Sequence, residues 1–218
     1  MATEVIIISG TFAPPLGNNF YPYSSLVKLF ESAGYKVHLE TIRLLGIGRM
    51  ESSLEKIEQK YFQKNDSNYI LLGHSQGGLL ALSLASEYSD RVESVEIFGS
   101  PLYGTRLAPM WFPFPAIRAM NYRSRWLKQL REHENLNAQK VHSYFSALDT
   151  MVVPWIASML KDGNNHLLVP KRIEGVVKNT AKLLVGDRID GVDIIHGYGG
   201  HLAIVSHPAV LASIASRY

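Results

Sequence analysis

The chain has 218 residues, 46% of them hydrophobic and 19% charged, with a formal net charge of +3, which fits one well-buried globular domain. The small net charge, without a lysine- or arginine-rich run, argues against a nucleic-acid-binding protein. Cysteine is absent, which excludes disulfides and thiolate metal sites. The first residues carry no basic region, and no apolar run is long enough for a signal peptide or a membrane span. We therefore expect a cytoplasmic protein without an integral membrane segment.

Strand and helix patterns alternate along the chain, because short β-branched or apolar runs alternate with stretches of helical apolar spacing. This alternation predicts an α/β fold, a three-layer αβα sandwich with a mostly parallel central sheet. The expected strands are residues 5–9, 36–41, 68–72, 92–98, 141–148 and 192–196, and the expected helices are residues 24–34, about 52–64, 77–88, about 123–133 and 208–216.

The sequence predicts which residue ends one helix and which residue begins another. Gly34 follows the last apolar position of the helix at 24–34, where a glycine commonly stops a helix. Ser52 or Ser53 is expected to cap the second, charged helix.

The alternation breaks at about residues 102–139, where Met110–Pro115 is rich in aromatic residues and proline. We expect one domain over residues 1–218, with a small cap-like insertion at about 102–139. The pattern of residues 155–190 is less regular and predicts one or two helices and an irregular excursion.

The pentapeptide Gly73-His74-Ser75-Gln76-Gly77 lies between an expected strand and an expected helix. Its G-x-S-x-G form in that context is typical of a nucleophile elbow, a sharp turn that exposes a serine hydroxyl above a sheet. The glycines are needed because side chains two positions from the serine would crowd the turn. Ser75 is therefore the predicted nucleophile, and His74 is expected to point elsewhere. The alternative is an ordinary glycine-rich loop with an inert serine.

A serine nucleophile requires a base and an acid that orients the base, in the chain order serine, acid, histidine for this type of fold. His201 is the favoured base, because it lies in a glycine-rich loop just past the last strand, and His196 is the next candidate. Asp149 is the favoured acid, because it directly follows the strand at 141–148. The alternatives are a histidine satisfied by backbone groups and an aspartate that caps a turn.

Main-chain N–H groups must meet the negative charge of the tetrahedral intermediate. One is expected from Gln76 at the start of a helix, and the second from Thr11, with Phe12 as the alternative donor.

Aromatic residues are the candidates for substrate contact. Phe12, Trp111 and Phe112 are the expected substrate-binding residues, although the aromatic stretch of the insertion could instead pack the insertion onto the core. The same insertion carries a group of basic residues, interpreted as a solvated helix face or as a site for an anionic group: Arg118, Arg123, Arg125, Lys128 and Arg131.

These motifs together resemble the α/β-hydrolase family, and within it the small lipases and esterases of the bacterial triacylglycerol-lipase type. The resemblance implies Ser75, Asp149 and His201 as the catalytic triad, and the Thr11 and Gln76 amides as the oxyanion hole. The segments that carry it are Ser9–Phe12, Gly73–Gly78, Gly99–Gly104, Asp149–Pro154 and Gly200–Leu202.

The sequence therefore predicts a serine-dependent carboxylic ester hydrolase that forms an acyl-enzyme with a small-molecule ester or lipid-like substrate. The reaction needs no cofactor, and no tight cluster of metal ligands is present in the sequence. The alternatives are a thioesterase or an acyltransferase on the same triad, or a non-catalytic binding protein on a hydrolase fold. The short insertion predicts at most a small lid, and hence no strong interfacial activation. The oligomeric state stays open.

Overall fold

A single parallel sheet organises the part of the chain that the structure describes. The structure is a computed structural model that describes residues 2–13, 22–42, 46–64, 66–109, 112–132 and 140–218. Its sheet has seven strands in the order β2-β1-β3-β4-β5-β6-β7, and every neighbouring pair is parallel. The strands are β1 (Thr3–Ile8), β2 (Lys36–Glu40), β3 (Asn68–His74), β4 (Val92–Phe98), β5 (Val141–Ser146), β6 (Asn164–Val169) and β7 (Asp193–His196).

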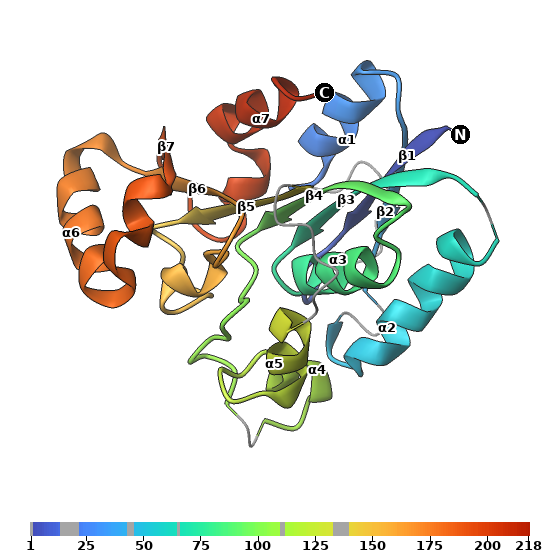
Figure 1. Cartoon of the computed structure of the whole chain (residues 1–218), viewed down its shortest axis with the longest axis horizontal. Coiled ribbons are helices and arrows are strands. Elements are labelled where there is room, and N and C mark those ends of the chain that lie inside the picture. Colours follow the sequence, from blue (N-terminus) through green and yellow to red (C-terminus); the bar gives the residue numbers. More distant parts are fainter. Residues whose placement is uncertain (1, 14–21, 43–45, 65, 110–111, 133–139) are drawn as a thin grey trace.

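Helices cover both faces of this sheet (Figure 1). In β1, Val5 and Ile7 pack with residues of α1 and α7, whereas Ile6 and Ile8 pack with residues of α2 and α3. A strand that is buried on both faces needs a continuous apolar run, which is why β1 lacks a polar face. The predicted three-layer α/β fold is confirmed, with a fully parallel sheet. The helices are α1 (Ser24–Ser32), α2 (Met50–Ile57), α3 (Gln76–Glu87), α4 (Pro115–Ala119), α5 (Arg125–Glu132), α6 (Glu174–Val185) and α7 (Pro208–Ala215).

The strand order places a crevice beside β3. From β1 the chain first adds β2 on one side and then β3 on the other side of β1. The connections that leave the carboxyl ends of β1 and β3 therefore diverge, and ligands of open α/β sheets bind in such crevices. The G-x-S-x-G segment begins in β3 and so lies at this position.

Helix α2 begins before both serines that were expected to cap it. Its first residue is the buried Met50, preceded by Arg49 in extended backbone, and no side chain caps it. Burial of Met50 in the core fixes the first turn instead, and Ser53 lies buried within the helix. The predicted cap is therefore wrong, because tertiary packing rather than a hydroxyl sets this helix start.

Residues 155–190 contain a strand that the sequence pattern did not predict. Strand β6 begins with the polar residues Asn164, Asn165 and His166, and it pairs with β5 and β7. The Asn165 side chain bonds the backbone of Leu160 at both N and O, and this pairing allows an amide to be buried in a strand. The expected irregular excursion is thus a strand followed by helix α6.

The described part of the insertion at 102–139 contains α4 and α5. Helix α5 was predicted, whereas the short α4, which has Pro115 at its first position, was not. Residues 110, 111 and 133–139 lie outside the described residues. Among the helices that are described, none is long and apolar enough to cross a membrane.

Candidate active site

Ser75 occupies a sharp turn between the end of β3 and the start of α3. Its backbone has φ 55° and ψ −121°, a conformation that costs a non-glycine residue about 1–3 kcal/mol. Two hydrogen bonds hold it there: the Ser75 N–H donates to the Phe98 carbonyl (2.7 Å), and the Gly78 N–H donates to the Ser75 carbonyl (3.2 Å). This is the geometry of a nucleophile elbow.

The two glycines of the motif are required by close backbone contacts. A Cβ atom on Gly73 would lie 2.4 Å from the Gly77 carbonyl oxygen, inside the turn itself. A Cβ atom on Gly77 would lie 2.3 Å from the carbonyl oxygen of Ile8 in β1. The crowding at Gly77 therefore comes from the neighbouring strand. Because glycine has no side chain, α3 can start directly against β1.

His201 and Asp149 form a hydrogen-bonded pair. The Nδ1 atom of His201 lies 2.8 Å from Oδ2 of Asp149, and both residues are buried. The other carboxylate oxygen, Oδ1, accepts the N–H groups of Met151 and Val152, each at 2.8 Å. The Asp149 carboxylate thus contacts the histidine through one oxygen and caps a turn through the other.

The sequence named His196 as the second candidate for the base. Its Nε2 atom bonds the Glu174 carboxylate at 2.8 Å on the exposed side of β7. It does not line the pocket that contains Ser75 and His201. The structure therefore brings Ser75, His201 and, through its hydrogen bond, Asp149 together, and it leaves His196 apart.

The two expected oxyanion donors are joined through their side chains. The Thr11 hydroxyl donates to the Gln76 side-chain carbonyl at 2.7 Å, which ties the loop after β1 to the start of α3. The Gln76 N–H is in the first turn of α3 and has no acceptor within the helix. Among the described residues, no acceptor is found for the N–H groups of Thr11 and Phe12. Phe12 has φ 63°, so the loop makes a tight turn at this point.

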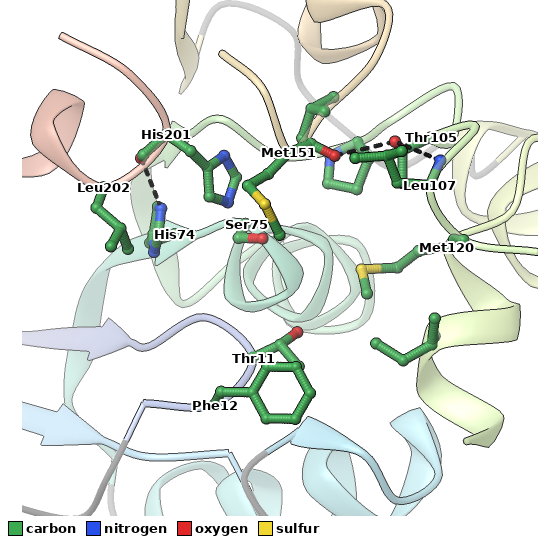
Figure 2. A pocket seen from close by; sticks show the side chains of 14 residues that line it. Thr11, Phe12, His74, Ser75, Thr105, Leu107, Met120, Met151, His201 and Leu202 are labelled. Atoms are coloured by element: carbon green, nitrogen blue, oxygen red, sulfur yellow. Dashed lines mark hydrogen bonds between the residues drawn. The ribbon is translucent and has the colours of Figure 1, made fainter. Parts of the chain in front are cut away.

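A mostly apolar cavity of about 270 Å³ opens beside Ser75. Figure 2 shows Ser75 between the His201 ring and the Thr11–Phe12 loop. The cavity is lined by Thr11, Phe12, His74, Ser75, Pro101, Thr105, Leu107, Ala108, Ile117, Met120, Met151, Val152, His201 and Leu202.

The lining differs in part from the residues expected to bind substrate. Phe12 lines the cavity, whereas Phe112 packs against Phe114 with ring centroids 5.3 Å apart and is not part of the lining. Trp111 lies outside the described residues. The insertion contributes smaller or unbranched side chains instead, among them Ile117 and Met120 from α4 and its C-terminal end. Their spacing of three residues, which places them on one helix face, was the signal available in the sequence.

His74 points into the site, contrary to the expectation. It is 2% exposed, it lines the cavity, and its ring centroid lies 4.7 Å from that of His201. Its Nε2 atom lies 3.0 Å from the His201 carbonyl oxygen, and its Nδ1 atom lies 2.8 Å from the Tyr23 hydroxyl. Burial, and next the charge of His201, lower the pKa of His74 to about 3. His74 is therefore neutral near pH 7.

The described residues contain no group of three or more His, Cys, Asp or Glu side chains that could hold a metal ion. The polar groups that the site itself offers are its serine, its imidazoles, its carboxylate and its main-chain N–H groups.

The chain matches a known protein family. A family model described as "Putative esterase" matches residues 51–159, half of the chain. A search of curated proteins finds no match to the sequence.

Several solved structures have a similar fold. Aspergillus fumigatus lipase B is 18% identical with a TM-score of 0.68, over 98% of this chain and 51% of the lipase, so the chain spans about half the length of that enzyme. A structure reported for the metagenome-derived lipolytic enzymes LipS and LipT is 12% identical with a TM-score of 0.57, over 99% of this chain and 91% of that one. The thioesterase domain from the curacin biosynthetic pathway is 14% identical with a TM-score of 0.54, over 99% of this chain and 90% of that one. Such identities show the fold, and together with the family match they confirm the resemblance inferred from the motifs: the chain belongs to the esterase family and has the α/β-hydrolase fold.

Proposed function

We propose that this protein is a serine-dependent carboxylic ester hydrolase in which Ser75, His201 and Asp149 form the catalytic triad. Membership of the esterase family supports an ester substrate. The observation that carries the proposal is the hydrogen-bonded His201–Asp149 pair beside a serine held at positive φ, on one apolar cavity. Packing of the core alone would not require these three features together.

The reaction follows from the position of each group. The Ser75 Oγ attacks the ester carbonyl carbon while Nε2 of His201 takes the hydroxyl proton. The N–H groups of Gln76 and Thr11 donate hydrogen bonds to the oxyanion that forms. The C–O bond of the ester then breaks, His201 returns the proton to the leaving alcohol, and an acyl group remains on Ser75. Water, activated by His201, cleaves the acyl-enzyme and releases the acid.

Asp149 fixes the state of His201 in this scheme. A carboxylate oxygen facing Nδ1 keeps the proton on Nδ1, so that Nε2 carries the lone pair that accepts the Ser75 proton. The carboxylate also stabilises the imidazolium that forms after proton transfer.

The cavity volume and its lining indicate a short or medium acyl chain. At about 270 Å³ the cavity is slightly smaller than the roughly 300–1,000 Å³ typical of sites for drug-sized ligands. We propose that residues 102–139 are a cap-like insertion in one hydrolase domain spanning 1–218. In this proposal Ile117 and Met120 limit the acyl chain, and the insertion forms at most a small lid.

Replacing Met120 by valine is expected to shift the preferred acyl chain towards longer esters. Met120 is 6% exposed and lines the cavity, so a shorter side chain makes room for additional methylene groups. One methylene in an apolar pocket changes kcat/KM by about tenfold or more, and we expect the ratio of long-chain to short-chain kcat/KM to rise by about tenfold. A series of p-nitrophenyl esters from acetate to decanoate measures the ratio.

Met159→Val is the matched control for this shift. Met159 is 2% exposed but packs in a separate core cluster with Phe145 and Ile156, so its truncation should leave the chain-length profile unchanged. An unchanged profile in Met120→Val, or an equal shift in Met159→Val, would show that Met120 does not limit the acyl chain.

A fluorophosphonate probe tests the serine mechanism directly. We expect one phosphonate per chain, located on Ser75 by peptide mass spectrometry, and complete loss of p-nitrophenyl ester turnover after labelling. Labelling of another serine, or full turnover by the labelled protein, would contradict the assignment. Product analysis with methanol present in competition with water separates the alternatives: free acid is expected of a hydrolase, and mainly methyl ester would indicate an acyltransferase.

A further inference from the structure

A chain of three hydrogen bonds connects the loop after β1 to the backbone of His201. The Gly10 N–H donates to the Tyr23 hydroxyl oxygen at 2.8 Å. The Tyr23 hydroxyl lies 2.8 Å from Nδ1 of His74, and Nε2 of His74 lies 3.0 Å from the His201 carbonyl oxygen. Figure 2 shows the last of these contacts, between His74 and His201 above the Thr11–Phe12 loop.

The donor and the acceptor of each of these hydrogen bonds follow from the groups at the two ends of the series, the His201 carbonyl and the Gly10 N–H. The His201 carbonyl can only accept, so Nε2 of His74 must carry the proton. Nδ1 of a neutral His74 is then an acceptor, so the Tyr23 hydroxyl donates to it. The Tyr23 oxygen accepts the Gly10 N–H. Every bond is therefore made only when His74 is the neutral Nε2–H tautomer.

The surroundings keep both side chains in the required form. Tyr23 and His74 are each 2% exposed. Burial raises the pKa of Tyr23 to about 12, so its hydroxyl keeps the proton that it donates. Burial, followed by the charge of His201, lowers the pKa of His74 to about 3. A second cationic imidazole, which would oppose proton uptake by His201, is thereby avoided.

Gly10 makes the close approach possible. A Cβ atom at this position would lie 2.9 Å from Nδ1 of His74 and 3.2 Å from Cβ of Ser75. The His74 ring therefore fills the space between Gly10 and His201. The residue after Gly10 is Thr11, the proposed oxyanion donor.

We propose that His74 and Tyr23 are positioning residues, which hold the His201 backbone and the oxyanion loop in one fixed arrangement around Ser75. This inference rests on the proposed function, in which His201 is the base. The side chain of His201 is fixed by Asp149, and the backbone of the same residue by His74, so the imidazole is held at two points. Because this chain of hydrogen bonds also includes the Gly10 N–H, a shift of the His201 backbone disturbs the turn that presents the Thr11 amide.

The test compares kcat and KM for Tyr23→Phe, His74→Leu and His74→Gln. Tyr23→Phe keeps the buried ring and removes the hydroxyl, and Tyr23 does not line the cavity. We expect kcat to fall about tenfold with KM within about twofold of wild type, because the variant loses both hydrogen bonds of the hydroxyl, the one from the Gly10 N–H and the one to Nδ1 of His74. His74→Leu should lower kcat further, and His74→Gln should recover part of the loss, because a glutamine amide can donate to the His201 carbonyl.

Matched controls remove similar groups elsewhere. Tyr69→Phe deletes a buried hydroxyl that donates to the Tyr61 carbonyl at 3.0 Å, away from the site. His166→Gln replaces another buried histidine, in β6. Both should keep kcat near wild type. A folded Tyr23→Phe with wild-type kcat, or equal losses in His74→Leu and His74→Gln, would overturn the positioning role.

A spectroscopic readout is independent of activity. Two-bond ¹H–¹⁵N NMR spectra report which ring nitrogen of a histidine carries the proton, and we expect His74 to be the neutral Nε2–H tautomer in wild type and a mixture of tautomers in Tyr23→Phe. A protonated His74, or the Nδ1–H tautomer in wild type, would overturn the inference. Failure of the two proposals is distinguishable: turnover by Ser75→Ala contradicts the serine mechanism, whereas an inactive Ser75→Ala beside a fully active Tyr23→Phe contradicts only the positioning role.

Discussion

Ser75→Ala is expected to lower kcat/KM for p-nitrophenyl esters by about 10⁴-fold to 10⁶-fold while the protein stays folded. The Ser75 Oγ forms the covalent bond to the acyl group, so its removal leaves only the oxyanion donors and substrate binding to accelerate the reaction. Alanine can take up the backbone of the turn at a cost similar to that of serine, because both have a Cβ atom at φ 55°. Steady-state kinetics and urea unfolding of the same preparations separate loss of chemistry from loss of fold.

Ser86→Ala is the matched control for this variant. Ser86 lies eleven residues after Ser75, in α3, is 2% exposed, and has a hydroxyl with no hydrogen-bond partner within the part of the chain that the structure describes. Its replacement should therefore change neither kcat nor stability appreciably. A folded Ser75→Ala that retains a tenth or more of wild-type turnover would show that Ser75 is not the nucleophile, whatever the Ser86 control does.

The strands of the sheet were predictable where β-branched or other apolar residues recur along the whole run. The run Val5–Ile8 is β-branched throughout, and β4 was predicted with its observed bounds, Val92–Phe98. Strand β6 was not predictable in the same way, because its first residues are polar. His166 is buried by stacking on Tyr144 and by its contact with Asp193, two partners that are distant in sequence. Only the assembled sheet supplies those partners.

The candidate triad could be named from the sequence because each member occupies a position that the fold makes recognisable. Ser75 lies in a turn with a strict glycine pattern, Asp149 follows β5, and His201 follows β7. The order of these three along the chain is itself a constraint, so few alternatives remained among eight histidines.

The lining of the cavity could not be named in this way. Aromatic residues in a sequence suggest substrate contact, but whether a side chain reaches the cavity depends on how the insertion folds back over the sheet. Helix α4 carries Ile117 to the cavity, with Met120 just beyond its end, whereas Phe112 contacts Phe114. His74 shows the same limit: its orientation is set by Tyr23, which is distant in sequence.

Asp149→Asn is expected to lower kcat by about 10⁴-fold with little change in stability. The asparagine carbonyl can still accept the N–H groups of Met151 and Val152, so the turn that Asp149 caps is kept. The amide NH₂ then takes the place of Oδ2 and faces Nδ1 of His201. Since an NH₂ group only donates, Nδ1 must become the acceptor and the proton moves to Nε2. An imidazole with Nε2 protonated cannot take the proton of Ser75, and in a serine hydrolase this wrong tautomer costs about 10⁴ in kcat.

Asp193→Asn is the matched control, because it changes the same kind of pair outside the site. Asp193 lies 3.2 Å from Nδ1 of His166, between β7 and β6, so its substitution alters an aspartate–histidine contact without reaching Ser75. We expect near wild-type kcat in this variant and a rate of fluorophosphonate labelling that falls only in Asp149→Asn. Asp149→Ala adds a second comparison: it also removes the acceptor for two N–H groups, so it should lose stability by about 1–3 kcal/mol, which Asp149→Asn should not. A folded Asp149→Asn with kcat within tenfold of wild type would mean that the carboxylate holds the turn but does not set the tautomer of His201.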